Sequence, residues 1–102
     1  MKNNIFEDCA VLIHKAFDLP GEKRELSREG LIDMLEPEIR SLLDRNFEKL
    51  LQICYRIDLG EEKLKHILQK SNPEYLCKDL TEALVDRQIL KVKLKSQYKN
   101  QD

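Results

Sequence analysis

Hydrophobic residues recur at helical spacing along most of this chain. Between residues 5 and 19 they stand three or four positions apart, so they share one side of a helix and leave the charged residues on the other. Pro20 and Gly21 end this pattern, because Pro disfavours helix in the residue before it and Gly tolerates positive φ. We therefore predict a helix over residues 5–19 whose apolar face holds Ile5, Phe6, Cys9, Leu12, Ile13, Ala16 and Phe17.

The residues after this turn predict two helices that separate at Pro37. Ser27 is a good N-cap, so a short helix should run from there to about Leu35. Pro37 either kinks this helix or stands in the first turn of a new one, and we favour the second interpretation. The new helix, about 38–57, has a broad apolar stripe typical of a central helix: Ile39, Leu42, Leu43, Phe47, Leu50, Ile53, Cys54 and Ile57.

The last third of the chain predicts two more helices. A weakly amphipathic one should cover about 59–70, with Asp58 as its cap, and a longer one should begin at Pro73 and run to about Lys95. Only residues 90–95 alternate like a strand, and they have no second strand to pair with. The fold class is therefore an all-α single-domain bundle of four or five helices around a central helix at about 38–57. It spans residues 1–102, with about 96–102 as a frayed basic tail.

Composition adds limits to this picture. The chain has 102 residues, 41% hydrophobic and 36% charged, and a formal net charge of −1, which fits one globular domain and not a disordered tail. No apolar run approaches the length of a membrane span, and the residues after Met1 do not resemble a signal peptide. We expect a mature protein that starts near Met1 and stays in the cytoplasm.

Candidate chemistry is sparse. Cys9, Cys54 and Cys77 are odd in number and fall on apolar helix faces, so we interpret them as reduced, buried thiols. His14 and His66 are placed on the opposite, polar faces, so the two types of zinc ligand do not converge. Phosphate-binding loops and nucleophile motifs are absent from the sequence. We predict no enzymatic activity, no metal, no cofactor and no small-molecule substrate.

A second apolar ridge on the last predicted helix suggests an interaction. Val85, Ile89 and Val92 lie on the side of that helix away from its main stripe of Leu76, Leu80 and Leu84. Either another helix of the chain covers this ridge or a second copy does, and symmetric dimers are common among small proteins. Candidate self-association residues are Val85, Ile89, Val92 and Tyr55.

The same region carries the strongest local charge. Residues 87–101 contain five basic residues and no acid, whereas residues 1–86 hold 13 basic and 18 acidic residues. This stretch is either a solvated basic helix end or a contact for RNA or another anionic partner. A helix-turn-helix is disfavoured, because the N-terminal part of the last helix carries four acidic residues against Lys78 alone, and phosphates would repel it; the four are Glu74, Asp79, Glu82 and Asp86. Candidate anion contacts are Arg87, Lys91, Lys93, Lys95 and Lys99.

Two polar residues fall on apolar stripes. Asn46 lies in the middle of the predicted central stripe, and Arg87 lies within the main stripe of the last helix. A buried amide needs hydrogen-bond partners and a buried Arg needs a carboxylate, so we predict a buried polar network. Its candidate members are Asn46, Arg87, Asp44, Asp58 and Asp86.

The stretch from Asp44 to Asp58 (DRNFEKLLQICYRID), followed by Asp86-Arg87-Gln88, resembles a small uncharacterised bacterial helical family. Members of that family share a D-F-E-x-L-L-x-x-x-Y-R-I-D-like core, in which Asn46 of this chain takes the place of the first Asp. The resemblance implies a helical fold and a bacterial origin, and no activity. The preferred function is a cytoplasmic interaction or structural module that forms a homodimer through its last helix. The alternative is a weak binder of nucleic acid or an anionic partner through residues 87–99.

Overall fold

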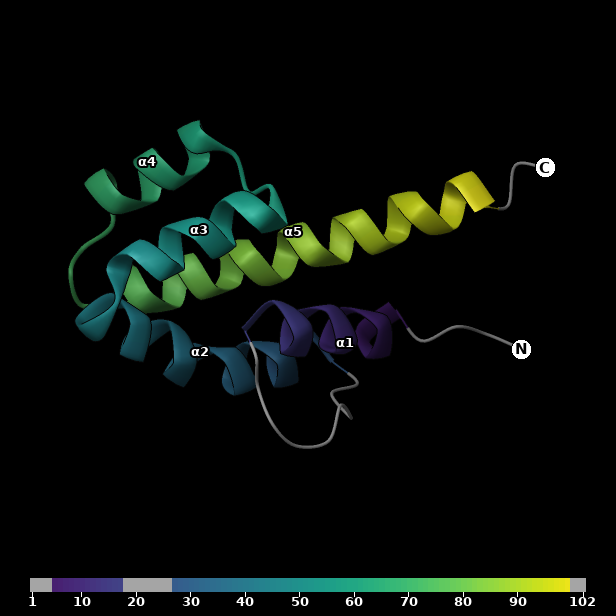
Figure 1. Ribbon diagram of the computed structural model, residues 1–102, viewed down its shortest axis with the longest axis horizontal. Coiled ribbons are helices and arrows are strands. Elements are labelled where there is room, and N and C mark those ends of the chain that lie inside the picture. Colours follow the sequence, from purple (N-terminus) through teal and green to yellow (C-terminus); the bar gives the residue numbers. More distant parts are fainter. Residues whose placement is uncertain (1–4, 18–26, 100–102) are drawn as a thin grey trace.

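The computed structural model describes residues 5–17 and 27–99, except for the side chains of Ser96, Tyr98 and Lys99. Five helices fill this part of the chain: α1 (Ile5–Phe17), α2 (Arg28–Arg45), α3 (Phe47–Ile57), α4 (Glu61–Lys70) and α5 (Leu76–Lys99). The described residues contain no strand, and the helices pack into one bundle (Figure 1). The prediction of an all-α bundle of four or five helices is confirmed.

The central helix is α5. It contacts each of the other four helices, with α2 and α1 as its most extensive neighbours (Figure 1). The first half of α5 is buried on several sides, and even Thr81 has no exposed surface. The Thr81 hydroxyl donates a hydrogen bond of 2.7 Å to the Cys77 carbonyl, which satisfies this buried polar group inside the helix. The prediction of a central helix at about 38–57 is therefore wrong.

The predicted 38–57 helix is divided at Asn46, and α2 runs through Pro37 without ending there. Asn46 adopts φ −151° and ψ 70°, and its side-chain oxygen accepts a hydrogen bond of 3.2 Å from the Lys49 amide. Asn is among the best N-cap residues, because its side chain satisfies an amide that the first helical turn leaves unpaired. At this position capping overrides the continuous apolar pattern, and the chain turns from α2 into α3.

Asn46→Ala is expected to lower the free energy of unfolding by about 1 kcal/mol, because the α3 N-terminus loses its side-chain acceptor. Asn46→Asp keeps an acceptor and is the matched control, with a stability close to that of the wild type. Urea unfolding followed by circular dichroism measures both variants. Equal losses in the two variants would contradict the capping role.

The connections around α4 differ from the predicted boundaries. Asp58 adopts a left-handed conformation (φ 68°) and closes the C-terminus of α3, so it does not cap α4. Gly60, with φ 102°, precedes α4 and makes no side-chain capping bond. Residues 73–75 form a turn, in which the Tyr75 amide donates to the Asn72 carbonyl at 2.8 Å, and α5 starts only at Leu76.

Two further boundaries concern the ends of the chain. Residues 90–95 are helical, and α5 continues to Lys99, so a frayed tail from residue 96 is not observed up to that point. Residues 100–102 lie outside the described residues, as do residues 18–19 of the first predicted helix.

Ser27 caps α2 as predicted, since its hydroxyl accepts a 3.0 Å hydrogen bond from the Gly30 amide.

Helix α1 packs on α2, α3 and α5 with a face rotated from the predicted one. His14 is only 5% exposed, whereas Leu12, placed by the sequence on the apolar face, is 40% exposed. The buried side is formed by Cys9, Ala10, Ile13, His14 and Phe17. This rotation turns Leu12 toward the rim of the bundle.

No helix in the described part of the chain is long and apolar enough to cross a membrane.

Candidate functional site: an apolar cleft with a basic rim

The ridge predicted for self-association lies largely inside the single chain. Val85 has no exposed surface, Val92 is 9% exposed, and Ile89 is half-buried against the core. Helix α1 packs along this part of the molecule beside α5, so the chain covers the ridge with its own residues. The prediction that these three residues form a docking surface for a second copy of the chain is therefore wrong. Tyr55 is 57% exposed and is the only one of the four candidates that is freely accessible.

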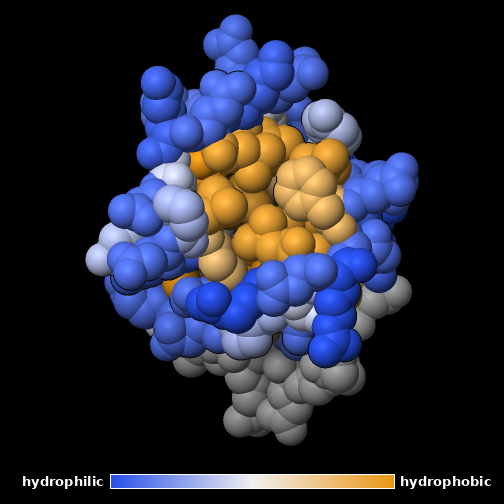
Figure 2. Space-filling view, turned by 90° about the vertical axis from the view of Figure 1, so that its left-hand side faces the viewer, coloured by the Kyte–Doolittle hydropathy of each residue, from blue (hydrophilic) through white to orange (hydrophobic). Residues whose placement is uncertain are grey.

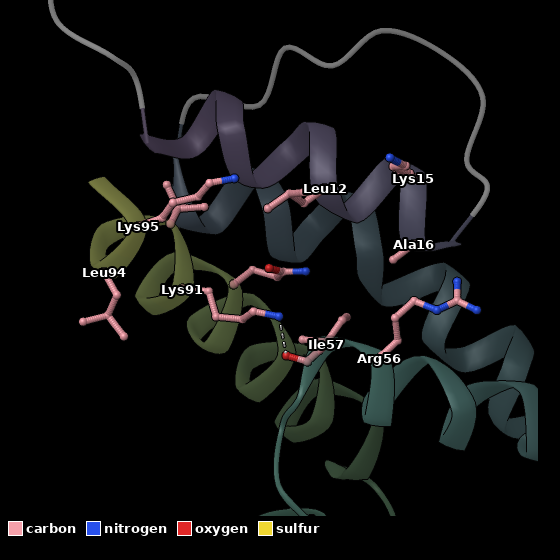
Figure 3. Close-up of a pocket in the computed structure, with 10 residues that line it drawn as sticks. Leu12, Lys15, Ala16, Arg56, Ile57, Lys91, Leu94 and Lys95 are labelled. Atoms are coloured by element: carbon pink, nitrogen blue, oxygen red, sulfur yellow. Dashed lines mark hydrogen bonds between the residues drawn. The ribbon is translucent and has the colours of Figure 1, made fainter. Parts of the chain in front are cut away.

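A cleft of about 610 Å³ opens where α1, α3 and α5 meet (Figure 3). Helix α3 ends at Ile57, while α5 continues past it beside α1 (Figure 1). The cleft forms beyond the end of α3, because no third helix of the described chain lies between α1 and α5 there. Its lining residues are Leu12, Lys15, Ala16, Arg56, Ile57, Gln88, Lys91, Val92, Leu94 and Lys95.

The lining combines aliphatic residues with positive charge. Figure 3 shows Leu12 and Ala16 of α1 between Lys95 on one side of the cleft and Arg56 on the other. Among the described residues, all four charged side chains that line the cleft are basic and none is acidic. The chain as a whole carries 18 basic and 19 acidic residues, so this segregation of charge is local and does not follow from composition.

Lys91 is held in place within this rim. Its Nζ donates a hydrogen bond of 3.0 Å to the Ile57 carbonyl at the C-terminus of α3 (Figure 3). A cation is favourable there, because the last carbonyls of a helix lack partners and carry partial negative charge. Lys15, Arg56 and Lys95 form no ion pair with any residue of the described chain. These three cations can therefore turn toward an anion in the cleft.

Only part of the predicted basic stretch reaches this cleft. Lys91 and Lys95 line it, whereas Arg87 pairs with Asp58 at 3.2 Å and Lys93 is exposed outside it. The Lys99 side chain lies outside the described residues. Lys15 and Arg56, which the sequence analysis missed, come from α1 and α3. No linear signal joins them to residues 87–99, since only the packing of three helices brings them together.

The predicted buried polar network does not form as one unit: Arg87 pairs with Asp58, one of the carboxylates predicted for it, and the other members form separate contacts. Asp86 accepts two hydrogen bonds from Arg28, at 2.6 and 3.0 Å, which link α5 to the first turn of α2 and raise the pKa of Arg28. Asp58 receives Arg87, Asn46 caps α3, and Asp44 is exposed. These contacts lie at or near the surface, where such pairs contribute little to stability.

The three thiols are free and buried, as predicted. Burial raises the pKa of Cys9 and of Cys54 to about 11, and it also raises the pKa of Cys77. The Cys77 thiol donates to the Glu36 carbonyl at 3.4 Å. Thiolates are the reactive form of cysteine, so these residues have the character of small apolar core groups.

The raised thiol pKa values predict a loss of stability at alkaline pH. A group whose pKa is higher in the folded state stabilises the fold fully below its unfolded pKa, which is 9.0 for cysteine, and this contribution is lost as the pH rises toward 11. We expect about 1 kcal/mol per thiol to be lost near pH ~10. Melting temperatures between pH 8 and pH 11 measure this loss. A Cys9→Ala/Cys54→Ala variant should show a shallower decline, and an identical decline would contradict the assignment.

The described residues contain no group of His, Cys, Asp and Glu that could hold a metal ion. His66 is exposed on α4.

No family model, no curated protein and no solved structure matches this chain. The resemblance based on residues 44–58 and 86–88 therefore stays a prediction.

A second apolar region lies at the opposite end of the bundle. Figure 2 shows hydrophobic side chains gathered in the face where α4 and the α2–α3 junction lie in Figure 1. Phe47, at the start of α3, is 41% exposed. Half-buried apolar residues on the helices at this end include Leu43, Leu51, Leu68 and Leu76. We refer to Phe47 and these four residues as the end face.

Proposed function

We propose that this protein is a non-catalytic binding module that holds an amphipathic anion in the cleft between α1, α3 and α5. The ligand has an aliphatic body and one carboxylate-like group. The observation that carries the proposal is the lining itself, in which the described aliphatic side chains adjoin four basic residues and no described acidic one. Burial of the aliphatic body supplies affinity, and the rim cations orient the charged end.

The size and chemistry of the cleft favour a small ligand over a nucleic acid. A volume of about 610 Å³ lies within the ~300–1,000 Å³ typical of small-molecule sites. None of the described side chains that line the cleft is aromatic, so they offer no platform on which bases could stack. The anionic-partner alternative from the sequence is thus narrowed to a small anion with an aliphatic body.

The proposal is tested by calorimetric titration with ligands of one chain length. Dodecanoate, below its micelle concentration, is expected to bind with a dissociation constant in the micromolar range. Dodecan-1-ol keeps the aliphatic body without the charge and should bind at least ~10-fold more weakly, and dodecylammonium weaker still. Raising the salt concentration should weaken only the carboxylate. Equal binding of the carboxylate and the alcohol would contradict the role of the rim.

The end face favours a second candidate function, self-association with another copy of the chain. Exposed residues of both signs, Asp44, Arg45, Glu48 and Lys49, flank Phe47 in the sequence. An apolar centre with charges of both signs at its edge can pair with itself across a two-fold axis. Light scattering should then show a dimer that Phe47→Glu converts to a monomer. A monomeric wild-type protein would overturn this candidate without affecting the cleft.

A further inference from the structure

The cations of the cleft are divided between its two ends. Figure 3 shows Lys95 on one side of Leu12, and Lys15 and Arg56 lie on the other side. The directions of the helices give the same order. Helix α1 runs opposite to α5 (Figure 1), so Lys15, in the last turn of α1, lies at the other end of the cleft from Lys95, near the end of α5. The positive charge is therefore not gathered at one point.

The middle of the cleft is aliphatic, and the one cation there is already engaged. Leu12 of α1 and Ile57 of α3 lie between the two ends in Figure 3. Lys91 lies there too, and its Nζ donates a hydrogen bond of 3.0 Å to the Ile57 carbonyl. The three cations at the ends form no ion pair with any described residue. Unpaired positive charge thus lies at both ends of an apolar strip.

The length of the cleft sets the spacing of the charged groups that a ligand can place at its ends. The lining residues on α5 run from Gln88 to Lys95, which is about 10 Å along the axis at the ~1.5 Å rise per residue of a helix. An extended aliphatic chain advances by about 1.25 Å per C–C bond, so the two carboxyl carbons of decanedioate lie about 11 Å apart. The chain of this ligand therefore matches the length of the strip.

A monocarboxylate satisfies the cations at only one end, whichever way round it binds. A ligand with a carboxylate at each end meets both sets of cations, and its methylene chain covers the aliphatic middle. We propose that the cleft binds medium-chain α,ω-dicarboxylates, with one carboxylate at Lys95 and the other at Lys15 and Arg56. This inference rests on the proposed function and adds a second anionic group to its ligand.

Decanedioate and its monomethyl ester, the half-ester, test the second contact directly by calorimetric titration. The two ligands share the chain and one carboxylate, and they differ in whether the other end is charged. We expect wild-type protein to bind decanedioate at least ~10-fold more tightly than the half-ester. Hexanedioate, with about 6 Å between its carboxyl carbons, is too short to reach both ends, so its preference over its own half-ester should stay below ~3-fold.

Lys95→Gln removes the cation at one end of the cleft and keeps a polar side chain. The ratio between decanedioate and its half-ester should then fall below ~3-fold, while the half-ester keeps most of its affinity, because its carboxylate can bind at the other end. Lys93→Gln is the matched control, since Lys93 is exposed on α5 outside the cleft, and it should leave the ratio unchanged. Both substitutions are at exposed positions, so circular dichroism should show the helix content of the wild type.

The outcomes separate this inference from the proposed function. If wild-type protein binds decanedioate no more tightly than the half-ester, the inference is overturned, while the proposed function stands as long as dodecanoate binds. A preference that persists in Lys95→Gln, or that hexanedioate shares, also overturns it, because the two carboxylates would then not be held at opposite ends. An equal fall of the ratio in Lys93→Gln overturns it too, since net charge would explain the preference. If decanedioate, the half-ester and dodecanoate all fail to bind, both ideas are overturned.

Discussion

Val85→Asp is expected to unfold the chain. Val85 has no exposed surface and lies on α5, the helix that contacts every other helix of the bundle. A carboxylate there would lose its hydration without gaining a partner, and such changes cost more than about 4 kcal/mol. Small domains have a total stability of only about 5–15 kcal/mol. Far-ultraviolet circular dichroism should therefore show little helix, or a much lower urea midpoint.

Leu90→Asp is the matched control for this prediction. It introduces the same side chain into the same helix, at a residue that is 45% exposed. Its effect should stay within about 1 kcal/mol, because the new carboxylate remains in water. Equal losses in the two variants would show that the ridge is not buried by the chain's own helices. If Val85→Asp instead stays folded and dissociates a dimer, the interpretation from sequence is restored.

Reversing two rim charges is expected to have the second-largest effect. In a Lys15→Glu/Lys95→Glu variant, the affinity for dodecanoate should fall at least about 100-fold, which corresponds to about 2.7 kcal/mol. Two attractive contacts become repulsive in a partly desolvated cleft, where charges interact more strongly than in water. Neither lysine forms an ion pair within the described part of the chain, so the fold should be retained. Calorimetry measures the affinity, and circular dichroism checks the helix content.

The control variant, Lys65→Glu/Lys93→Glu, changes the net charge by the same amount. Both residues are exposed, and neither lines the cleft. At about 150 mM salt, charges further than ~8 Å from the ligand are largely screened, so we expect less than a ~3-fold loss. A loss as large as that of the rim variant would mean that the overall charge, and not the cleft, attracts the ligand.

Local sequence patterns predict the elements of this fold well. The apolar spacing places the first helix and the last two close to their observed positions, and the Ser27 cap is correct. The three cysteines are buried and free, because small apolar residues on a helix stripe face the core. Each of these predictions depends on interactions between residues that are near in sequence.

Predictions that depend on tertiary packing fail. Two apolar faces on the last helix arise because α5 occupies the centre, where neighbours cover it on more than one side. Asn46 and Pro37 are both residues at which a helix can end. The structure ends α2 before Asn46, which caps α3, and continues α2 through Pro37. The burial of His14 depends on how α1 is rotated against its neighbours, which periodicity alone does not fix.

The cleft is the feature of this structure that the sequence predicts least well. The sequence predicts Lys91 and Lys95 as anion contacts, and both line the cleft. No sequence pattern places Lys15 or Arg56 in a site, and Gln88 belongs only to the Asp86-Arg87-Gln88 element. These residues meet because α3 stops at Ile57 while α1 and α5 continue, a consequence of helix lengths and packing rather than of any motif.

Amide NMR during a titration with dodecanoate tests the central claim most directly, because it locates the ligand residue by residue. Binding in the cleft predicts shifts that saturate together and concentrate on residues 12–16, 56–57 and 88–95, with little change around Phe47. Shifts centred on the end face, or no saturable shifts below the micelle concentration, would contradict the claim that the basic-rimmed cleft is the binding site.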